Sequence, residues 1–198
     1  MDWAAIHRLR LAEAFGDMQK FQAVTCDAEL LAELFEWTTR GVVFIHDDDT
    51  AGHSVFVTDT RGLGGDKTFR VDNAGHTDLF LWHIDGVMYR KGSKCDCAFL
   101  TDGRLGFVEF KTNAANNTEE AIRENYEKAK SQLLQTIADV TARCDNVGVD
   151  LMDTAVVEAY AVFNPTMPRH NAYQKKLAAE FLMETEGIPL YFDNSTEI

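Results

Sequence analysis

Short β-prone segments separated by Asp-Gly pairs fill residues 79 to 111, and this pattern constrains the fold more than any other in the chain. The segments read LFLWHI, VMYRK, KCDCAFLT and RLGFVEFK, with Asp85-Gly86 after the first and Asp102-Gly103 between the last two. An Asp-Gly pair between two such segments is a strong local signal for a two-residue β-turn that reverses the chain. Residues 79 to 111 are therefore predicted to form an antiparallel meander.

The turn at Asp102-Gly103 also predicts the register of the hairpin that it closes. If these are the two loop residues, the residues on either side of the turn pair with each other, and counting back along both strands places Asp96 opposite Glu109. Side chains alternate between the two faces of a strand. Asp96, Glu109 and Lys111 are therefore expected on one face of the hairpin.

Two directly opposed carboxylates repel each other, because their Cβ atoms lie only about 5 Å apart. A divalent cation between Asp96 and Glu109 would remove that repulsion, and oxygen ligands favour Mg²⁺ or Mn²⁺. Alternatively, one carboxyl group stays protonated, or both side chains extend into water. Lys111 adds an ammonium that can hold a phosphate, orient an attacking water and stabilise negative charge. Together these groups are the minimum set for hydrolysis of a phosphodiester.

Asp96 followed by Glu109-Phe110-Lys111 resembles the motif of the PD-(D/E)xK nuclease superfamily, in which an Asp is followed on the next strand by Glu or Asp, any residue and Lys. Cys95 stands where the motif often has proline. The resemblance implies that Asp96, Glu109 and the backbone carbonyl of Phe110 bind the metal ion, while Lys111 assists the attack of water.

The resemblance also implies accessory residues outside the hairpin. In several branches of the superfamily a Gln on the following helix contributes to the site, and Gln132 and Gln135 are the candidates here. A Glu from the early core helix joins the metal site in some members, for which Glu33 is the candidate, with Glu36 behind it. The restriction-endonuclease-like core implied by the resemblance spans about residues 27–163.

The whole chain is predicted to be one domain of the α/β class, with a mixed central sheet that contains the antiparallel meander and is flanked by helices. The domain would consist of an N-terminal helix within 1–24, the core at 27–163, and a C-terminal helix and strand at 171–198. The predicted helices cover about residues 2–22, 25–37, 118–143 and 171–186. The predicted strands outside the meander cover 42–45, 155–163 and 188–192, and the polar, glycine-bearing residues 46–75 are predicted as loop.

The 198 residues carry a net charge of −13, which is unusual for a protein that binds nucleic acid. Residues 87–111 are the exception, with five basic against three acidic side chains, so a local patch that attracts phosphate is expected around the hairpin. No apolar run approaches the roughly 20 residues of a membrane span. The four cysteines lack the spacing of a zinc site or a disulfide framework. A soluble cytoplasmic protein is the expectation.

These patterns favour a metal-dependent nuclease, and the resemblance favours DNA over RNA as its substrate. No module for reading bases is apparent, so specificity would come from a protein partner, a homo-oligomer or the structure of the nucleic acid. A role in host defence follows only by analogy. Two rival hypotheses stay open: a restriction-fold binding or regulatory subunit without activity, and an unrelated α/β protein whose acidic hairpin is surface decoration.

Overall fold

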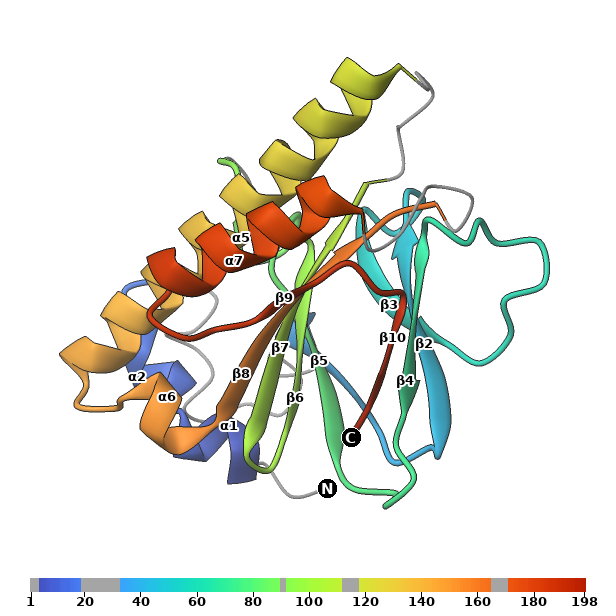
Figure 1. Cartoon of the computed structure of the whole chain (residues 1–198). Coiled ribbons are helices and arrows are strands. Elements are labelled where there is room, and N and C mark those ends of the chain that lie inside the picture. Colours follow the sequence, from blue (N-terminus) through green and yellow to red (C-terminus); the bar gives the residue numbers. More distant parts are fainter. Residues whose placement is uncertain (1–3, 19–32, 90–91, 112–117, 165–170) are drawn as a thin grey trace.

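A mixed sheet of six strands forms the centre of the protein in our computed structural model, which describes residues 4–18, 33–89, 92–111, 118–164 and 171–198 (Figure 1). The strands are β1 (Phe35–Thr38), β5 (Leu79–His83), β6 (Cys97–Thr101), β7 (Arg104–Phe110), β8 (Val156–Val162) and β9 (Leu190–Tyr191). Their order is β1-β5-β6-β7-β8-β9, antiparallel from β1 to β7 and parallel from β7 to β9. The prediction of a mixed sheet with an antiparallel meander is confirmed.

The β6–β7 hairpin has the register that its Asp-Gly turn predicts. Thr101 pairs with Arg104, and the ladder continues to the first residue of β6. Asp96 lies one residue before that strand, so the backbone pairing stops just short of joining it to Glu109. Asp96 contacts β7 through its side chain instead, which accepts a hydrogen bond from a backbone N–H of that strand.

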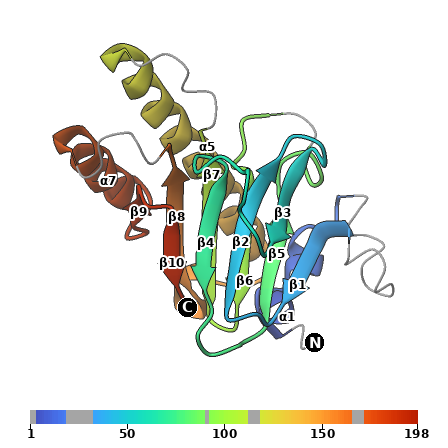
Figure 2. The ribbon, with the colours of Figure 1, turned by 90° about the vertical axis from the view of Figure 1, so that its right-hand side faces the viewer.

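A second sheet of four strands packs on one face of the first sheet (Figure 2). It consists of β2 (Val42–Asp48), β3 (His53–Val57), β4 (Thr68–Asp72) and β10 (Ser195–Glu197), in the order β10-β4-β2-β3. The interpretation of residues 46–75 as loop was therefore wrong, and the second sheet was not expected. β4 buries Phe69 and Val71 alternately against the first sheet, but it is too short for that alternation to stand out in the sequence.

The long helices α5 (Glu119–Asn146) and α7 (Ala172–Glu184) pack on the other face of the large sheet (Figure 1). Both were predicted. Thr118 caps α5 by accepting a hydrogen bond from the N–H of Ala121 at 3.3 Å, and Asn171 forms a capping box with Gln174 at the start of α7. The short helix α6 (Leu151–Thr154) leads into β8. No helix among the described residues is long and apolar enough to cross a membrane.

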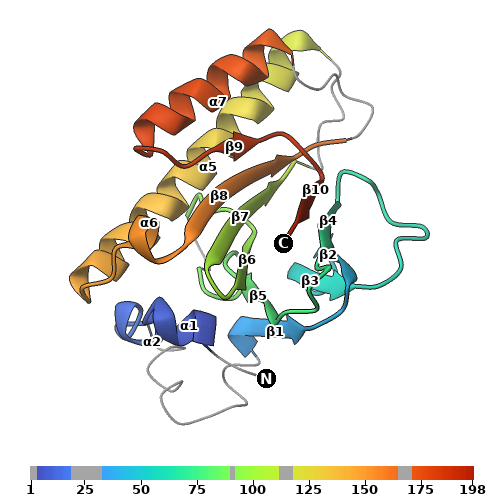
Figure 3. The same cartoon turned by 60° about the horizontal axis from the view of Figure 1, so that its bottom comes forward.

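Three sequence predictions were wrong in their local structure. Within residues 4–18, the expected single helix is two short ones, α1 (Ala4–Arg8) and α2 (Leu11–Ala14), because Arg10 adopts a left-handed backbone with φ of 48° (Figure 3). Phe35–Thr38 pairs with β5 as a strand instead of ending a helix, and residues 25–32 of that expected helix lie outside the described residues. The described residues 87–89 form a turn instead of the strand expected for VMYRK.

Alternation along the hairpin divides the core between the two faces of the large sheet. Ala98 and Leu100 of β6 face the helices, whereas Cys97 and Phe99 face the second sheet. Gly106 of β7 leaves room for the Phe99 ring, since a Cβ atom at this position would lie 2.1 Å from a ring carbon. The hairpin is therefore buried on both sides, and any charged side chain that it carries inward needs a partner.

Candidate functional site

Glu109 is such a charged side chain, with only 1% of the residue exposed near the end of β7. By alternation it shares the helix-facing side of the strand with Leu105 and Phe107. Lys111 Nζ donates a hydrogen bond to Glu109 Oε1, whereas Oε2 is buried without a hydrogen-bond partner among the described residues. A buried carboxylate is costly unless its oxygens are satisfied, so Oε2 is well suited to bind a cation.

Asp96 reaches the same end of the hairpin from the residue before β6. Its Oδ2 accepts a hydrogen bond from the backbone N–H of Phe110 at 2.6 Å. Its backbone carbonyl accepts one from the N–H of Asp85 at 3.1 Å. The carboxylate is thus held against the residue that follows Glu109, even though the strand ladder ends one pair earlier.

The pKa of both carboxyl groups is raised by their surroundings. Burial is the largest cause for Asp96, whose pKa is raised from 3.8 to about 7, and the negative charges of Asp47 and Asp85 act in the same direction. Burial likewise raises the pKa of Glu109 well above its ordinary value, followed by the charge of Asp96, while Lys111 lowers it. The site concentrates negative charge in a place with little water, which is the environment that a bound cation stabilises.

Lys111 is held between the strand and helix α5. Its backbone N–H donates to the carbonyl of Val162 at 2.9 Å, which continues the β7–β8 pairing past the end of β7. Its ammonium donates to Glu109 Oε1 and to the side-chain oxygen of Gln132. The amide nitrogen of Gln132 in turn donates to the backbone carbonyl of Lys94 at 2.9 Å. One glutamine of α5 therefore connects the ammonium to the chain segment just before Asp96.

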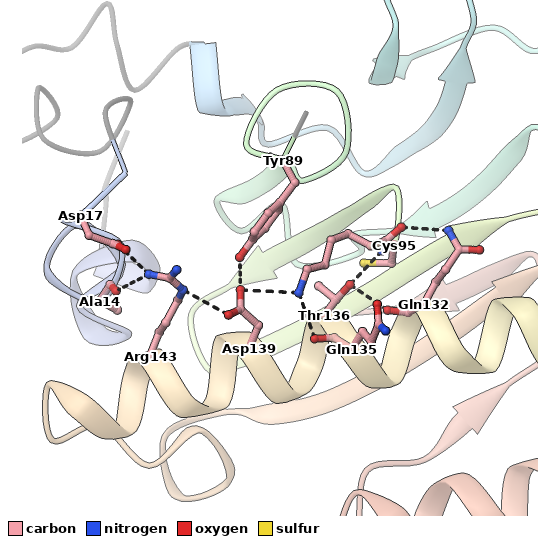
Figure 4. A network of polar contacts seen from close by, with 10 residues as sticks. Ala14, Asp17, Tyr89, Cys95, Gln132, Gln135, Thr136, Asp139 and Arg143 are labelled. Carbon is pink, nitrogen blue, oxygen red and sulfur yellow. Dashed lines mark hydrogen bonds and ion pairs between the residues drawn. The ribbon is translucent and has the colours of Figure 1, made fainter. Parts of the chain in front are cut away.

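Helix α5 fixes that segment at further points, which Figure 4 shows as a network along one side of the helix. The backbone N–H of Cys95 donates to Thr136 Oγ1 at 2.8 Å, and Lys94 Nζ donates to the backbone carbonyl of Gln135 at 3.2 Å. Asp139, one turn further along the helix, accepts a hydrogen bond from the Tyr89 hydroxyl. Tyr89 and the segment from Lys94 to Cys95 are thus attached to the same helix, and this attachment positions the neighbouring Asp96.

The same network reaches the N-terminal helices. Arg143 Nε contacts Asp139 at 3.3 Å, and its Nη1 contacts Asp17 at 2.6 Å (Figure 4). Its guanidinium also lies 4.9 Å from the centre of the Phe15 ring. The segment after α2 is therefore joined through α5 to the segment that precedes Asp96.

The structure brings together four of the residues predicted for the site: Asp96, Glu109, Lys111 and Gln132. The side chain of Gln135 is exposed, and only its backbone carbonyl takes part, through Lys94. The roles of Gln135 and of the Phe110 carbonyl as site groups stay predictions.

Two other residues that the sequence interpretation named lie elsewhere in the described structure. Glu33 is exposed, and its backbone carbonyl contacts His83 at 3.1 Å, on the face of the sheet opposite Glu109; its role as an accessory ligand stays a prediction. Arg104, counted in the basic patch, lies at the turn end of β7 and forms an ion pair with Glu158 at 2.7 Å. The basic residues of the segment are therefore divided between the two ends of the hairpin.

Asp47 belongs to this neighbourhood, although the sequence interpretation had placed the acidic run from Asp47 to Asp49 in a solvated loop. It lies in β2, in phase with Val43 and Ile45, which pack towards the large sheet. Burial is the largest cause of its raised pKa. The signal in the sequence was the continuation of the strand alternation through VVFIHDD, which a run of three Asp residues obscured.

The residues present fit a hard divalent cation. The donor atoms are carboxylate oxygens, which suit Mg²⁺ or Mn²⁺, and the buried Oε2 of Glu109 is available to such an ion. Comparisons of the chain with protein-family models, with curated proteins and with solved structures give no match.

Proposed function

We propose that this protein is a metal-dependent phosphodiesterase of the PD-(D/E)xK type, with a restriction-endonuclease-like core made of the β5–β6–β7 meander, α5 and β8. The observation that carries the proposal is the buried Glu109 carboxylate, with one oxygen bound by Lys111 and the other without a hydrogen-bond partner among the described residues. The Asp96 carboxylate adds a second negative charge at the same end of the hairpin. A buried carboxylate, a half-buried one and an ammonium at one point are costly for stability alone, which supports a catalytic role.

Lys111 has the clearest role in the chemistry. Because Glu109 and Gln132 hold its ammonium from two sides, the charge is fixed in place before a substrate binds. An ammonium in this position binds a non-bridging phosphate oxygen and stabilises the negative charge that develops during attack. It also orients the water that attacks phosphorus.

Asp96 and Glu109 would hold a Mg²⁺ or Mn²⁺ ion, and the carbonyl of Phe110 is the third candidate ligand. Such an ion, when bound, lowers the pKa of a coordinated water and polarises the phosphoryl oxygen. The hydrogen bond from the Phe110 amide fixes the direction of the Asp96 carboxylate. The Lys111 ammonium offsets one of the two negative charges. This reduces the repulsion between the two carboxylates and leaves one net negative charge to bind a cation.

DNA is the proposed substrate, ahead of RNA, on the resemblance of the motif. The net charge of −13 makes tight binding of bare nucleic acid by this chain alone unfavourable. A protein partner or a second copy of the chain would then supply basic surface. The same acidity favours a second candidate function, a restriction-fold subunit that binds partners and has no activity of its own.

The deciding experiment is incubation of the purified chain with supercoiled plasmid, single-stranded DNA and RNA in Mg²⁺ or Mn²⁺. The wild type should cut at least one substrate, and Lys111→Ala should reduce the rate by about 100-fold or more. Lys128→Ala is the matched control, because Lys128 is exposed on α5 and its substitution removes the same positive charge. EDTA should stop cleavage by the wild type.

Cation binding separates the two candidate functions. A thermal scan with Mn²⁺ should raise the Tm of the wild type and of Lys111→Ala, but not that of Asp96→Ala. Cleavage that is unchanged in Lys111→Ala would refute the proposed mechanism. A chain that neither cuts nucleic acid nor gains stability with Mn²⁺ would leave the binding subunit as the better proposal.

A further inference from the structure

A second group of ligand-type side chains lies on the opposite face of the large sheet from Glu109. Glu36 comes from β1, His53 from β3 and His83 from β5, and one ligand atom of each lies within 4.8 Å of the others. His83 is in phase with Leu79 and Leu81, which pack towards the second sheet. The three side chains therefore meet between the two sheets, and each is supplied by a different strand.

His83 is the buried member, with 3% of the residue exposed. Its Nδ1 lies 3.1 Å from the backbone carbonyl oxygen of Glu33, which can only accept a hydrogen bond. Nδ1 must therefore carry the proton in the neutral ring, and the lone pair is left on Nε2. This arrangement, with one ring nitrogen donating to a carbonyl, is the one that orients metal-binding histidines in proteins.

The Nε2 atom of His83 is buried and has no hydrogen-bond partner among the described residues. It lies 3.4 Å from Oε1 of Glu36. A lone pair on nitrogen that faces a carboxylate oxygen is repulsive unless a cation lies between or beside them. The orphaned nitrogen is thus an independent sign that this group of side chains binds something positive.

The other two side chains are also held in place. Oε2 of Glu36 accepts a hydrogen bond from the backbone N–H of Phe56 at 2.9 Å, which leaves Oε1 directed at His83. The His53 ring lies 4.5 Å from the His83 ring, centre to centre. Their strands are kept together by the Asp85-Gly86 turn, because the backbone at Gly86 (φ 74°) lies so close to Gly52 that a Cβ would be 2.2 Å from its carbonyl oxygen.

We propose that Glu36, His53 and His83 bind a zinc-type transition-metal ion. Two imidazole nitrogens and one carboxylate oxygen are a ligand set that Zn²⁺ uses with a water in its fourth position. This set differs from the all-oxygen donors around Asp96, so the two sites select different ions. The proposal does not depend on the nuclease activity, since it does not use Asp96, Glu109 or Lys111.

The ion would join the two sheets at their edges. β1 is the outer strand of the large sheet and β3 is the outer strand of the second sheet, and no strand of the described residues continues either sheet beyond them. Because a metal ion binds the folded chain and has no preformed site in the unfolded one, its affinity adds to stability. Zn²⁺ should therefore raise the Tm of the protein whether or not a nucleic acid is cut.

The test is titration of the chelator-treated full chain with Zn²⁺, followed by calorimetry, together with the visible absorption of Co²⁺ as a reporter of coordination. We expect one tight Zn²⁺ per chain, and an affinity at least about 100-fold weaker in His53→Ala. His7→Ala is the matched control, because His7 is exposed on α1 and has no place in the group. Asp96→Ala should keep the Zn²⁺ affinity of the wild type.

Each outcome bears on the proposal. His83→Gln should weaken Zn²⁺ binding like His53→Ala, and circular dichroism of both variants in EDTA checks that the fold is intact. Zn²⁺ binding that is equal in His53→Ala and the wild type, or that is lost in Asp96→Ala, would overturn the assignment. Absence of tight Zn²⁺ binding to the wild type would likewise overturn it.

Discussion

The free energy of unfolding of the metal-free protein should depend on pH through Asp96. Burial is the main cause that raises the pKa of this carboxyl from 3.8 to about 7. Below the lower value both the folded and the unfolded chain hold the proton, so the group has no effect on stability. Between the two values the unfolded chain releases a proton that the folded chain keeps, and the free energy of unfolding falls as pH rises. At about 1.4 kcal/mol for each pKa unit, the full loss above the higher value is roughly 4 kcal/mol.

Asp96→Asn removes this titration while keeping an oxygen that can accept the hydrogen bond from Phe110. In EDTA at pH 8 the variant should therefore be more stable than the wild type, by up to roughly 4 kcal/mol, and the difference should vanish near pH 4. The charge of Asp96 also raises the pKa of Glu109, so its removal relieves a second unfavourable interaction in the same direction. With saturating Mn²⁺ the order should reverse, because only the wild type gains from the ion.

Urea denaturation, followed by the fluorescence of tryptophan residues that include the buried Trp82, measures these differences at several pH values. Asp102→Asn is the matched control, since Asp102 is exposed at the tip of the same hairpin and forms only an exposed ion pair with Arg8. Its stability should follow that of the wild type within about 1 kcal/mol at every pH. Parallel pH profiles for Asp96→Asn and the wild type would refute the reasoning, because they would mean that the Asp96 carboxyl is well solvated.

Three further predictions concern single contacts. Gln132→Ala should lower the rate of nucleic-acid cleavage in single-turnover kinetics by about 10-fold or more, because it removes one of the two groups that hold the Lys111 ammonium. The Mn²⁺ concentration needed for half-maximal cleavage should change little, because both carboxylates remain. Gly106→Ala should cost about 1 to 3 kcal/mol in urea denaturation, since its Cβ would overlap the Phe99 ring, and a neutral result would mean that the ring moves freely. Gly86→Ala should lower the Tm and weaken Zn²⁺ binding together, since it separates β3 from β5; a change in only one would contradict the coupling.

The hairpin and the long helices could be predicted because their signals are local. The Asp102-Gly103 turn determines its own register, and Thr118 marks the start of α5 within one residue. The register brought Asp96 to the right end of the hairpin, but the ladder ends one pair before Glu109, and the hydrogen bond from the Phe110 amide completes the placement. The placement of Gln132 followed from the resemblance. The burial of Glu109 could not be predicted, because it depends on how α5 packs against β7.

Only β2 of the second sheet was predicted, as a strand at 42–45, because the other strands are stabilised by partners distant in the sequence. β4 pairs with β10 near the C-terminus, and neither strand exceeds five residues. Phe35 and Trp37 fit the spacing of a helix as well as that of a strand, and pairing with β5 decides between the two. The group of Glu36, His53 and His83 was missed for the same reason, since its members meet only when β1, β3 and β5 are all in place.

The position of β7 has a consequence for how the protein opens. This strand is paired on both sides, by β6 and β8, and its residues from Leu105 to Phe110 are all buried. Amide hydrogens of such a strand exchange with solvent only when the whole domain unfolds, whereas edge strands such as β1 and β3 exchange through local fraying. An ion at Glu109 would therefore slow exchange of the entire domain, whereas an ion at His83 would slow it first in the edges.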